Sequence, residues 1–357
     1  MVGSPSLMPA ITAPPYLRQP LPAGIIFGSF ALLTLPLTAV LVSGLTQGTK
    51  DAIRLGYYWA FGLSHFILTF TVYLQQGNLV YFAKGWANRL VYFAAPLLIF
   101  AAFDVYGALG VAAARPAFDV GFRLAIRFAD FLHFGRQSFG VLQLFKISWG
   151  GTFSPWLRRA ENLLLWTTAL LMLETFAYGG TFTAEPWIVR ATIAVFVALL
   201  VPVIVGYVQA ARRAADPRSV YVPAAYLAVN LVAAGLAVSQ TILYFATLAI
   251  HYVEYHVLMA PRCFRADLSG TARIDRLFDR LRRRPLVFYA LLLGLAALAL
   301  LPFYGDSLTV GTSGPAYRTA IHLLDGLFVC HYFLEAFIWK FGNPFYRRTL
   351  GPLYLAR

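Results

Sequence analysis

The stretch AIHYVEYHVLM (residues 249–259) decides how this chain folds, because it places two histidines and a glutamate in an otherwise apolar segment. The same pattern recurs in FGLSHFILTF (61–70), ADFLHFGRQSFG (129–140) and AIHLLDGLFVCHYFLEAF (320–337). These stretches contain every histidine of the chain, namely His65, His133, His251, His256, His322 and His331, and three acids accompany the histidines closely: Glu254, Asp325 and Glu335. Ionisable side chains at membrane depth are costly and normally face a bundle interior. The pattern therefore indicates an intramembrane site.

The composition indicates a polytopic membrane protein. Apolar residues make up 59% of the chain and charged residues 12%, whereas soluble proteins carry about twice that share of charge. Runs near twenty apolar residues predict an all-α transmembrane bundle, one domain over residues 1–357, with about ten helices: 22–44, 56–76, 90–113, 118–146, 161–180, 187–210, 221–238, 240–261, 286–304 and 317–340. We place the break between the seventh and eighth near Gly235, Ser239 and Gln240. In the fourth, Arg127 and Asp130 can pair at i,i+3 spacing.

The net charge of +14 comes from basic residues in short loops between the apolar segments. Every second loop is basic, which the positive-inside rule explains without nucleic-acid binding. We therefore expect the basic loops and both termini in the cytoplasm, with the chain in a bacterial inner membrane. Residues 1–21 are expected to be a flexible tail, 261–285 a basic loop with an amphipathic helix on the membrane surface, and 341–357 a cytoplasmic tail.

Counting along the ten expected helices places all six histidines on the second, fourth, eighth and tenth, which run in the same direction. At a rise of about 1.5 Å per residue, four of them reach a similar depth and can meet: His65, His133, His251 and His331. The count places His256 nearer the cytoplasmic side and His322 nearer the outer side.

We expect a metal site assembled from several helices, with iron as the metal. The preferred ligands are His65, His251, His256 and His331, followed by His133 and His322. Spacings of three or four residues pair each acid with a histidine on one helix face, which predicts metal-binding, orienting or catalytic roles for Glu254, Asp325 and Glu335. Arg136 and Gln137, one turn after His133, are predicted to bind a cofactor carboxylate or to orient the imidazole.

Histidine and carboxylate ligands with open positions are typical of non-haem iron and dioxygen chemistry. They predict an iron-dependent membrane oxidoreductase whose lipophilic substrate, such as a carotenoid or acyl chain, partitions from membrane lipids, with an electron donor as a further partner. Aromatic residues beside the histidines are candidates to line the pocket: Phe66, Tyr252, Tyr255, Tyr332 and Phe333. Three alternatives stay open: a bis-histidine haem b electron-transfer protein, a proton-coupled transporter with a histidine and acid relay, and a non-catalytic assembly subunit.

The placement of His65 in an early segment, His251 in a late one, and His322 with Asp325 in the last resembles the Brp/Blh family of polytopic membrane carotene dioxygenases. The resemblance implies iron held by intramembrane histidines and a β-carotene-like substrate, although more helices are predicted here than that family has. The segment HYFLEAFIWKFGNPFYRRTLG (331–351) is similar to the C-termini of uncharacterised bacterial polytopic membrane proteins. That second resemblance implies no activity.

Overall fold

The computed structural model describes residues 21–109, 115–180, 186–239, 243–264, 272–308 and 315–354. Within these ranges every regular element is a helix and no strand occurs. The predicted all-α fold is therefore confirmed. Residues 1–20 of the expected N-terminal tail and 355–357 of the expected C-terminal tail lie outside the described residues.

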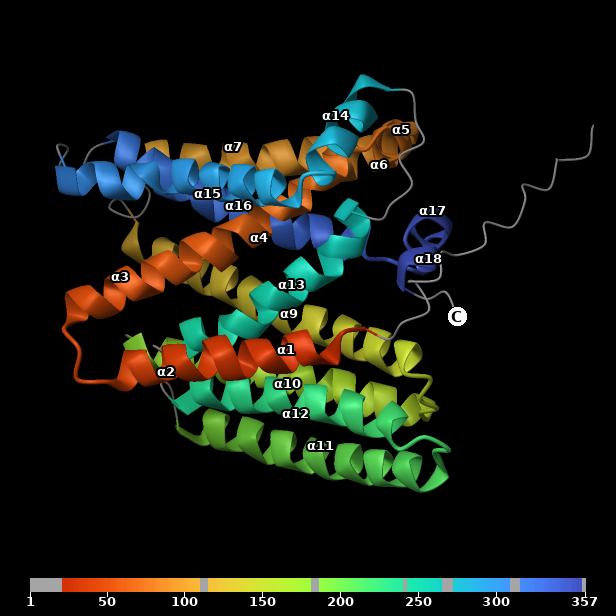
Figure 1. The fold of residues 1–357 in the computed structure, drawn as a ribbon. Coiled ribbons are helices and arrows are strands. Elements are labelled where there is room, and N and C mark those ends of the chain that lie inside the picture. Colours follow the sequence, from red (N-terminus) through yellow and green to blue (C-terminus); the bar gives the residue numbers. More distant parts are fainter. Residues whose placement is uncertain are drawn as a thin grey trace, which may run out of the picture.

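Helices lie in each of the ten predicted ranges (Figure 1). The first three ranges contain irregular helices with π or 3-10 turns: α1 (Ala23–Ser29), η2 (Phe30–Thr34) and α2 (Leu35–Val42); α3 (Gln47–Tyr57), η3 (Tyr58–Leu63), α4 (Ser64–Thr69) and η4 (Phe70–Leu74); α6 (Gly85–Arg89), η5 (Leu90–Ala94) and α7 (Ala95–Ala108). The later ranges contain long α-helices: α9 (Pro116–Ser148), α10 (Pro155–Gly180), α11 (Pro186–Arg213), α12 (Arg218–Ser239), α13 (Tyr244–Phe264), α15 (Pro285–Leu308) and α16 (Pro315–Ile338). Short helices complete the fold: α5 (Gln76–Ala83), α14 (Arg273–Arg282), α17 (Pro344–Thr349) and α18 (Gly351–Tyr354).

Two local predictions are confirmed. The break expected between the seventh and eighth segments falls between the end of α12 at Ser239 and the start of α13 at Tyr244. Within α9, the guanidinium of Arg127 lies 3.5 Å from the carboxylate of Asp130, as their spacing predicts.

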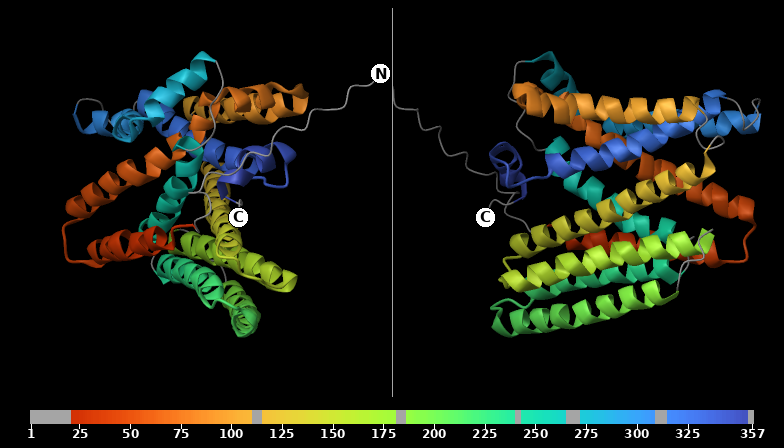
Figure 2. Two further views of the ribbon diagram at one scale, coloured as in Figure 1. Left: turned by 45° about the vertical axis from the view of Figure 1, so that its right-hand side comes forward. Right: turned by 180° about the vertical axis from the view of Figure 1, so that it is seen from behind.

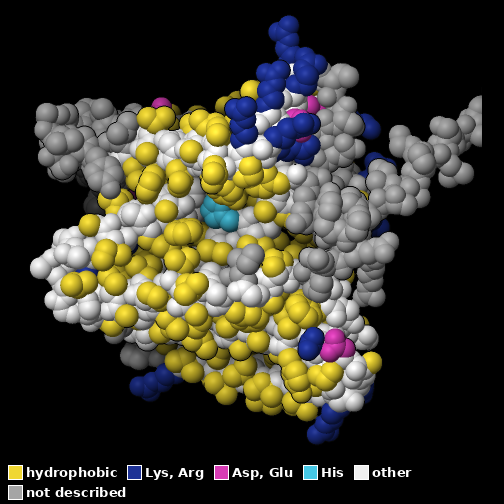
Figure 3. All heavy atoms as spheres, in the orientation of Figure 1, with side chains coloured by type: hydrophobic (Ala, Val, Ile, Leu, Met, Phe, Trp, Pro, Cys, Tyr) yellow, Lys and Arg dark blue, Asp and Glu magenta, His cyan; other side chains and the backbone are white. Residues whose placement is uncertain are grey.

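Three helices in the described ranges are long and apolar enough to cross a membrane: Gly85–Gly107, Trp187–Arg213 and Arg218–Ser239. The pair Arg273–Arg282 and Pro285–Leu300 qualifies only when taken together, and it bends by 104°. A few apolar helices could therefore span a membrane, which agrees with a membrane location, whereas ten crossings remain a prediction. On the face shown in Figure 3, hydrophobic side chains cover much of the surface, and many Lys and Arg side chains gather around α14.

The helices form two layers with a crossing pair between them (Figures 1 and 2). One layer contains α7, α15 and α16, and the other contains α10, α11 and α12. Between them α9 packs against α10, α12 and α16, while α13 packs against α12, α4 and α9. The buried side chains of Phe66, Phe131, Phe134 and Tyr252 fill this middle region. The middle region is where the histidine-bearing segments meet.

Candidate metal centre

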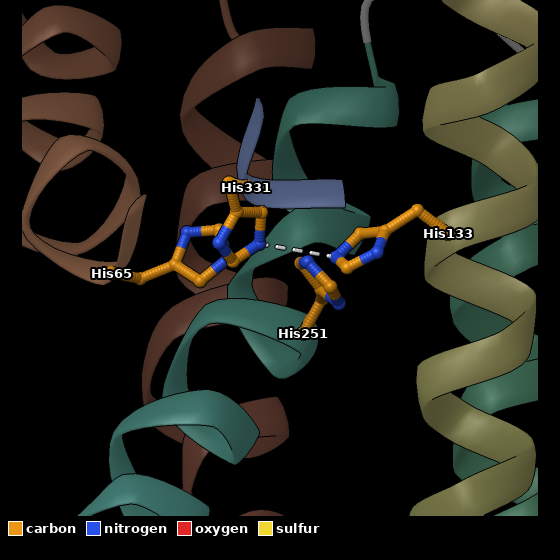
Figure 4. Close-up of side chains that lie close together, drawn as sticks. All are labelled: His65, His133, His251 and His331. Carbon is orange, nitrogen blue, oxygen red and sulfur yellow. Dashed lines mark hydrogen bonds between the residues drawn. The ribbon is translucent and has the colours of Figure 1, made fainter. Parts of the chain in front are cut away.

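Four imidazoles from four different helices converge in the middle region (Figure 4). They form the histidine group, which consists of His65 on α4, His133 on α9, His251 on α13 and His331 on α16. One ring nitrogen of each lies within 4.8 Å of the corresponding nitrogens of the other three. Metal–imidazole bonds are about 2.0–2.1 Å long, so nitrogens on opposite sides of one ion are about 4 Å apart. This buried group could therefore bind a metal ion, and the four histidines that were predicted to meet do converge.

The backbone around His65 is irregular in a way that orients its ring. α4 has only six residues and lies between the π turn η3 and the 3-10 turn η4, and π turns inside α-helices often mark functional sites. The Nδ1 of His65 lies 2.9 Å from the carbonyl oxygen of Gly62, the last but one residue of η3. A carbonyl only accepts, so Nδ1 donates the proton and Nε2 keeps its lone pair. Among the described residues this buried Nε2 has no hydrogen-bond partner.

Glycine is required at position 62 by close packing. A Cβ there would lie 2.6 Å from a ring carbon of Tyr58 and 3.1 Å from one of Tyr252. The absence of a side chain lets η3 approach α13 closely, next to the hydrogen bond between the Gly62 carbonyl and Nδ1 of His65.

His331 and His133 face each other through their Nε2 atoms, which are 3.2 Å apart. Two nitrogens at this distance need a proton or a cation between them, because two lone pairs would otherwise oppose each other. The other nitrogen of His331, Nδ1, lies 2.6 Å from the hydroxyl of Thr69, which lies 2.6 Å from the hydroxyl of Tyr255. Hydrogen bonds of this kind hold a ligand ring in position.

His251 completes the group from α13. Its ring centroid lies 5.1 Å from that of His65 and 5.0 Å from that of His133. Its Nδ1 is buried and, like Nε2 of His65, has no hydrogen-bond partner in the described part of the chain. A buried polar atom without a partner costs about 1–3 kcal/mol. A cation within the group would satisfy Nε2 of His65, whose other ring nitrogen already donates to Gly62.

The three predicted acids lie at different distances from the histidine group. Glu335 is adjacent, with Oε2 at 3.5 Å from Nε2 of His133 and 3.9 Å from Nε2 of His331. Glu254 is turned toward α12, where its Oε1 accepts a 2.8 Å hydrogen bond from the hydroxyl of Tyr226. Asp325 lies outside the group, with its carboxylate 3.9 Å from Nδ1 of His322. Only Glu335 is therefore placed to interact with an ion held by the four imidazoles.

The remaining predicted residues have other partners. His256 lies 3.2 Å from the hydroxyl of Ser64, so the structure groups His133 rather than His256 with the other three histidines. His322 packs against Tyr106, at a centroid distance of 5.2 Å.

Arg136 and Gln137, the predicted cofactor-binding pair, point to different neighbours. Arg136 donates a 2.8 Å hydrogen bond to Asn162 on α10. Gln137 donates a 3.0 Å hydrogen bond to the backbone carbonyl of His251 and so supports α13 beside the histidine group.

Thr69 was not predicted from the sequence. It follows His65 by four residues, so the two share a helix face, and this spacing was a usable signal. Its role depends on the packing of α16, which brings Nδ1 of His331 to 2.6 Å from the Thr69 hydroxyl.

A pocket of about 260 Å³ adjoins the histidine group, with lining residues on all four helices that carry the group. Three of the five predicted aromatic residues form its inner wall: Phe66, Tyr252 and Tyr332. The ring centroids of Phe66 and Tyr252 lie 4.2 and 4.8 Å from that of His65, and the centroid of Tyr332 lies 4.4 Å from that of His133. A single layer of aromatic rings therefore separates the pocket from the imidazoles.

Comparison with known proteins identifies no relative of this chain. The chain matches no family model, no curated protein and no solved structure.

Proposed function

We propose that this chain is a membrane metalloenzyme in which the histidine group holds one iron ion and a lipophilic substrate is oxidised. The observation that carries the proposal is the convergence of four buried imidazole nitrogens within 4.8 Å of one another. Unpaired polar groups are rarely retained at membrane depth without a function. A cation bound by Nε2 of His65 would satisfy a buried ring nitrogen that has no partner among the described residues.

Iron fits this donor set better than zinc in a structural role. Four-coordinate zinc would be closed by four protein ligands, whereas iron commonly takes more ligands and would keep open positions beside four imidazoles. The aromatic pocket next to the group favours a site with open positions. When bound, iron would supply the dioxygen chemistry.

The residues of the chain have separate roles in this proposal. The Gly62 carbonyl and the Thr69 hydroxyl hold the rings of His65 and His331. The Glu335 carboxylate, 3.5 Å from His133, is placed to accept a proton or to complete the coordination. Phe66, Tyr252 and Tyr332 exclude water from the imidazoles and offer an apolar wall to a substrate from the membrane.

Haem has less support from the ring geometry. Bis-histidine haem needs two imidazoles on opposite faces of a macrocycle, with the plane between them free. Here each of His65 and His133 lies 4.5–5.1 Å, between ring centroids, from both His251 and His331. Rings that close together on several sides favour a single ion.

The test is the metal content of purified protein and of matched histidine variants. We expect the wild type to hold iron, and His133→Ala, His251→Ala and His331→Ala each to lose most of it, because water replaces a lost imidazole poorly in an apolar site. His256→Ala and His322→Ala are the controls and should keep most of the iron while inserting equally well in the membrane.

Equal iron in all five variants, or none in the wild type after anaerobic reconstitution with ferrous iron, would contradict the proposal. An intense Soret band in the wild-type optical spectrum would instead support a haem protein. Dioxygen consumption with lipophilic substrates then tests the oxidation itself.

A further inference from the structure

The pocket beside the histidine group has an apolar inner end and a charged outer end. Along α9, Arg127 and Arg123 precede His133 by six and ten residues and line the pocket. At about 1.5 Å per residue they lie about 9 and 15 Å from His133 along the helix axis. On α16, Asp325 precedes His331 by six residues and lines the same pocket. Arg123, Arg127 and Asp325 therefore lie away from the imidazoles, whereas Asp130, the fourth charged residue of the lining, precedes His133 by only three residues.

Two of the four charged residues at this end already have strong partners. Asp130 accepts hydrogen bonds from the hydroxyls of Tyr244 and Tyr332, the latter at 2.6 Å. Arg123 forms an ion pair with Asp119 at 2.9 Å. Neither Asp130 nor Arg123 is therefore the first choice to bind a ligand.

Arg127 keeps most of its hydrogen-bonding capacity. A guanidinium carries five N–H donors, and Nη1 of Arg127 makes one long contact of 3.5 Å to Asp130. The guanidinium also lies over the ring of Phe176, at 5.4 Å from the centroid. Among the described residues, no other hydrogen bond of this side chain occurs.

Asp325 keeps its acceptor capacity in the same way. Its nearest ion-pair contact, to Nδ1 of His322, is 3.9 Å, beyond hydrogen-bond distance. In the described part of the chain no ion pair joins Asp325 to Arg127, although both line one pocket. A donor and an acceptor of opposite charge thus face the same cavity without contacting each other.

This arrangement discriminates between polar groups. A hydroxyl can accept from the guanidinium and donate to the carboxylate. A carboxylate would be repelled by Asp325 and an ammonium by Arg127, while a purely apolar end would offer neither charge a hydrogen-bond partner. The remaining wall, with Phe66, Leu248 and Phe328, suits a hydrocarbon.

We infer that the pocket binds a lipophilic alcohol, with its hydroxyl between Arg127 and Asp325 and its hydrocarbon directed toward the histidine group. The inference names the substrate class of the proposed enzyme and so rests on that function. Ligand pockets usually exceed about 300 Å³, so a cavity of about 260 Å³ suits an alcohol with a short hydrocarbon.

The test measures binding without metal. Metal-free wild-type protein in lipid nanodiscs is incubated with four ten-carbon probes, namely 1-decanol, decane, decanoate and decylamine, and bound probe is counted by native mass spectrometry. We expect 1-decanol to bind at least ~10-fold more tightly than the other three, which corresponds to about 1.4 kcal/mol.

Charge variants should change this preference in opposite directions. Asp325→Leu removes the acceptor and leaves Arg127, so decanoate should become the best ligand. Arg127→Met removes the donors and should favour decylamine. Arg190→Met, an exposed arginine on α11, is the control and should keep the preference for 1-decanol. No hydrogen bond of the Asp325 side chain occurs among the described residues, so its variant remains informative if Arg127→Met does not fold.

Three results would overturn the inference: tightest binding of decanoate to the wild type, equal binding of decane and 1-decanol, or no binding of any probe. None of these concerns iron, so each leaves the proposed metal site standing. Conversely, tight binding of 1-decanol by metal-free protein would support the inference even if neither the wild type nor any variant holds iron.

Discussion

The helices that most resemble membrane spans and the helices that carry the histidine group are different parts of the molecule. α11 and α12 each have the length and hydropathy to cross a membrane, and in α11 only 11% of the most apolar window is buried. No helix of the histidine group is among the qualifying helices of the described chain. α13 instead buries polar side chains such as His251, Glu254 and Arg262. Low hydropathy in α13 thus reflects a buried site rather than exposure to water.

The two regions also use buried charge differently. In the apolar half, which consists of α10, α11 and α12, Glu161 pairs with Lys146 at the end of α9, with both carboxylate oxygens 2.5 Å from Nζ. Nζ also lies 4.3 Å from the ring centroid of Phe153. This pair is satisfied within the protein, whereas the histidine group keeps two nitrogens without partners among the described residues. The pair therefore serves packing, and the group is open to a ligand.

The largest expected effect is on the stability of the apolar half. Glu161→Gln leaves the Lys146 ammonium buried without its counter-charge, which should cost about 3–5 kcal/mol of unfolding free energy. Denaturant titration followed by tryptophan fluorescence measures the loss, with Arg158→Gln at an exposed position of α10 as the control. Folded Glu161→Gln protein should keep its metal, and loss of metal would show that the two regions are coupled.

A smaller effect is expected from Thr69→Val, and it concerns metal affinity rather than stability. This variant removes the hydroxyl that lies 2.6 Å from Nδ1 of His331 but retains the volume. Metal affinity should fall about 10–100-fold, as it does when hydrogen bonds to ligands are removed. Competition with a chelator measures the affinity. Thr167→Val, whose hydroxyl donates a 2.9 Å hydrogen bond to the Leu163 carbonyl of its own helix, should bind metal normally. Unchanged affinity in Thr69→Val would remove Thr69 from the site.

The smallest effect is expected in α14, outside both regions. Hydrogen bonds from Arg282 and Arg283 lower the pKa of Asp279. The lowered pKa means that this carboxylate stabilises α14 above its unfolded pKa of about 3.9 and stops doing so as pH falls through the lower folded value. Hydrogen exchange of α14 should therefore rise below pH ~4 in the wild type. In Asp279→Asn it should be faster at neutral pH and less dependent on pH; identical profiles would contradict the assignment.

The sequence predicted which four histidines could meet, but not which face each helix turns toward the others. Counting residues along the segments placed His65, His133, His251 and His331 at one level, and they meet there. The same count did not support the choice of His256 rather than His133 as a preferred metal ligand, and the structure groups His133 with the other three. On one helix His251 and His256 are about 140° apart, so one of them at most faces the group, and the sequence does not say which.

The acids show the same limit. Spacing of three or four residues puts Glu254, Asp325 and Glu335 each on the face of a histidine. Which element packs against that face depends on the tertiary structure. Glu254 accepts a hydrogen bond from Tyr226 of α12, and Asp325 lines the pocket. Only Glu335 remains beside the imidazoles.

The sequence by itself determined the all-helical fold, most helix ends and the histidine-bearing segments, because hydropathy, helical rise and turn-forming residues are properties of the local chain. The tertiary structure alone decided the partners: the Gly62 carbonyl for His65, the Thr69 hydroxyl for His331, and the pocket that Arg127 and Asp325 share. These contacts depend on how each helix is rotated and how far it slides against its neighbours. That choice is made by side-chain packing between segments distant in the sequence, which no local pattern encodes.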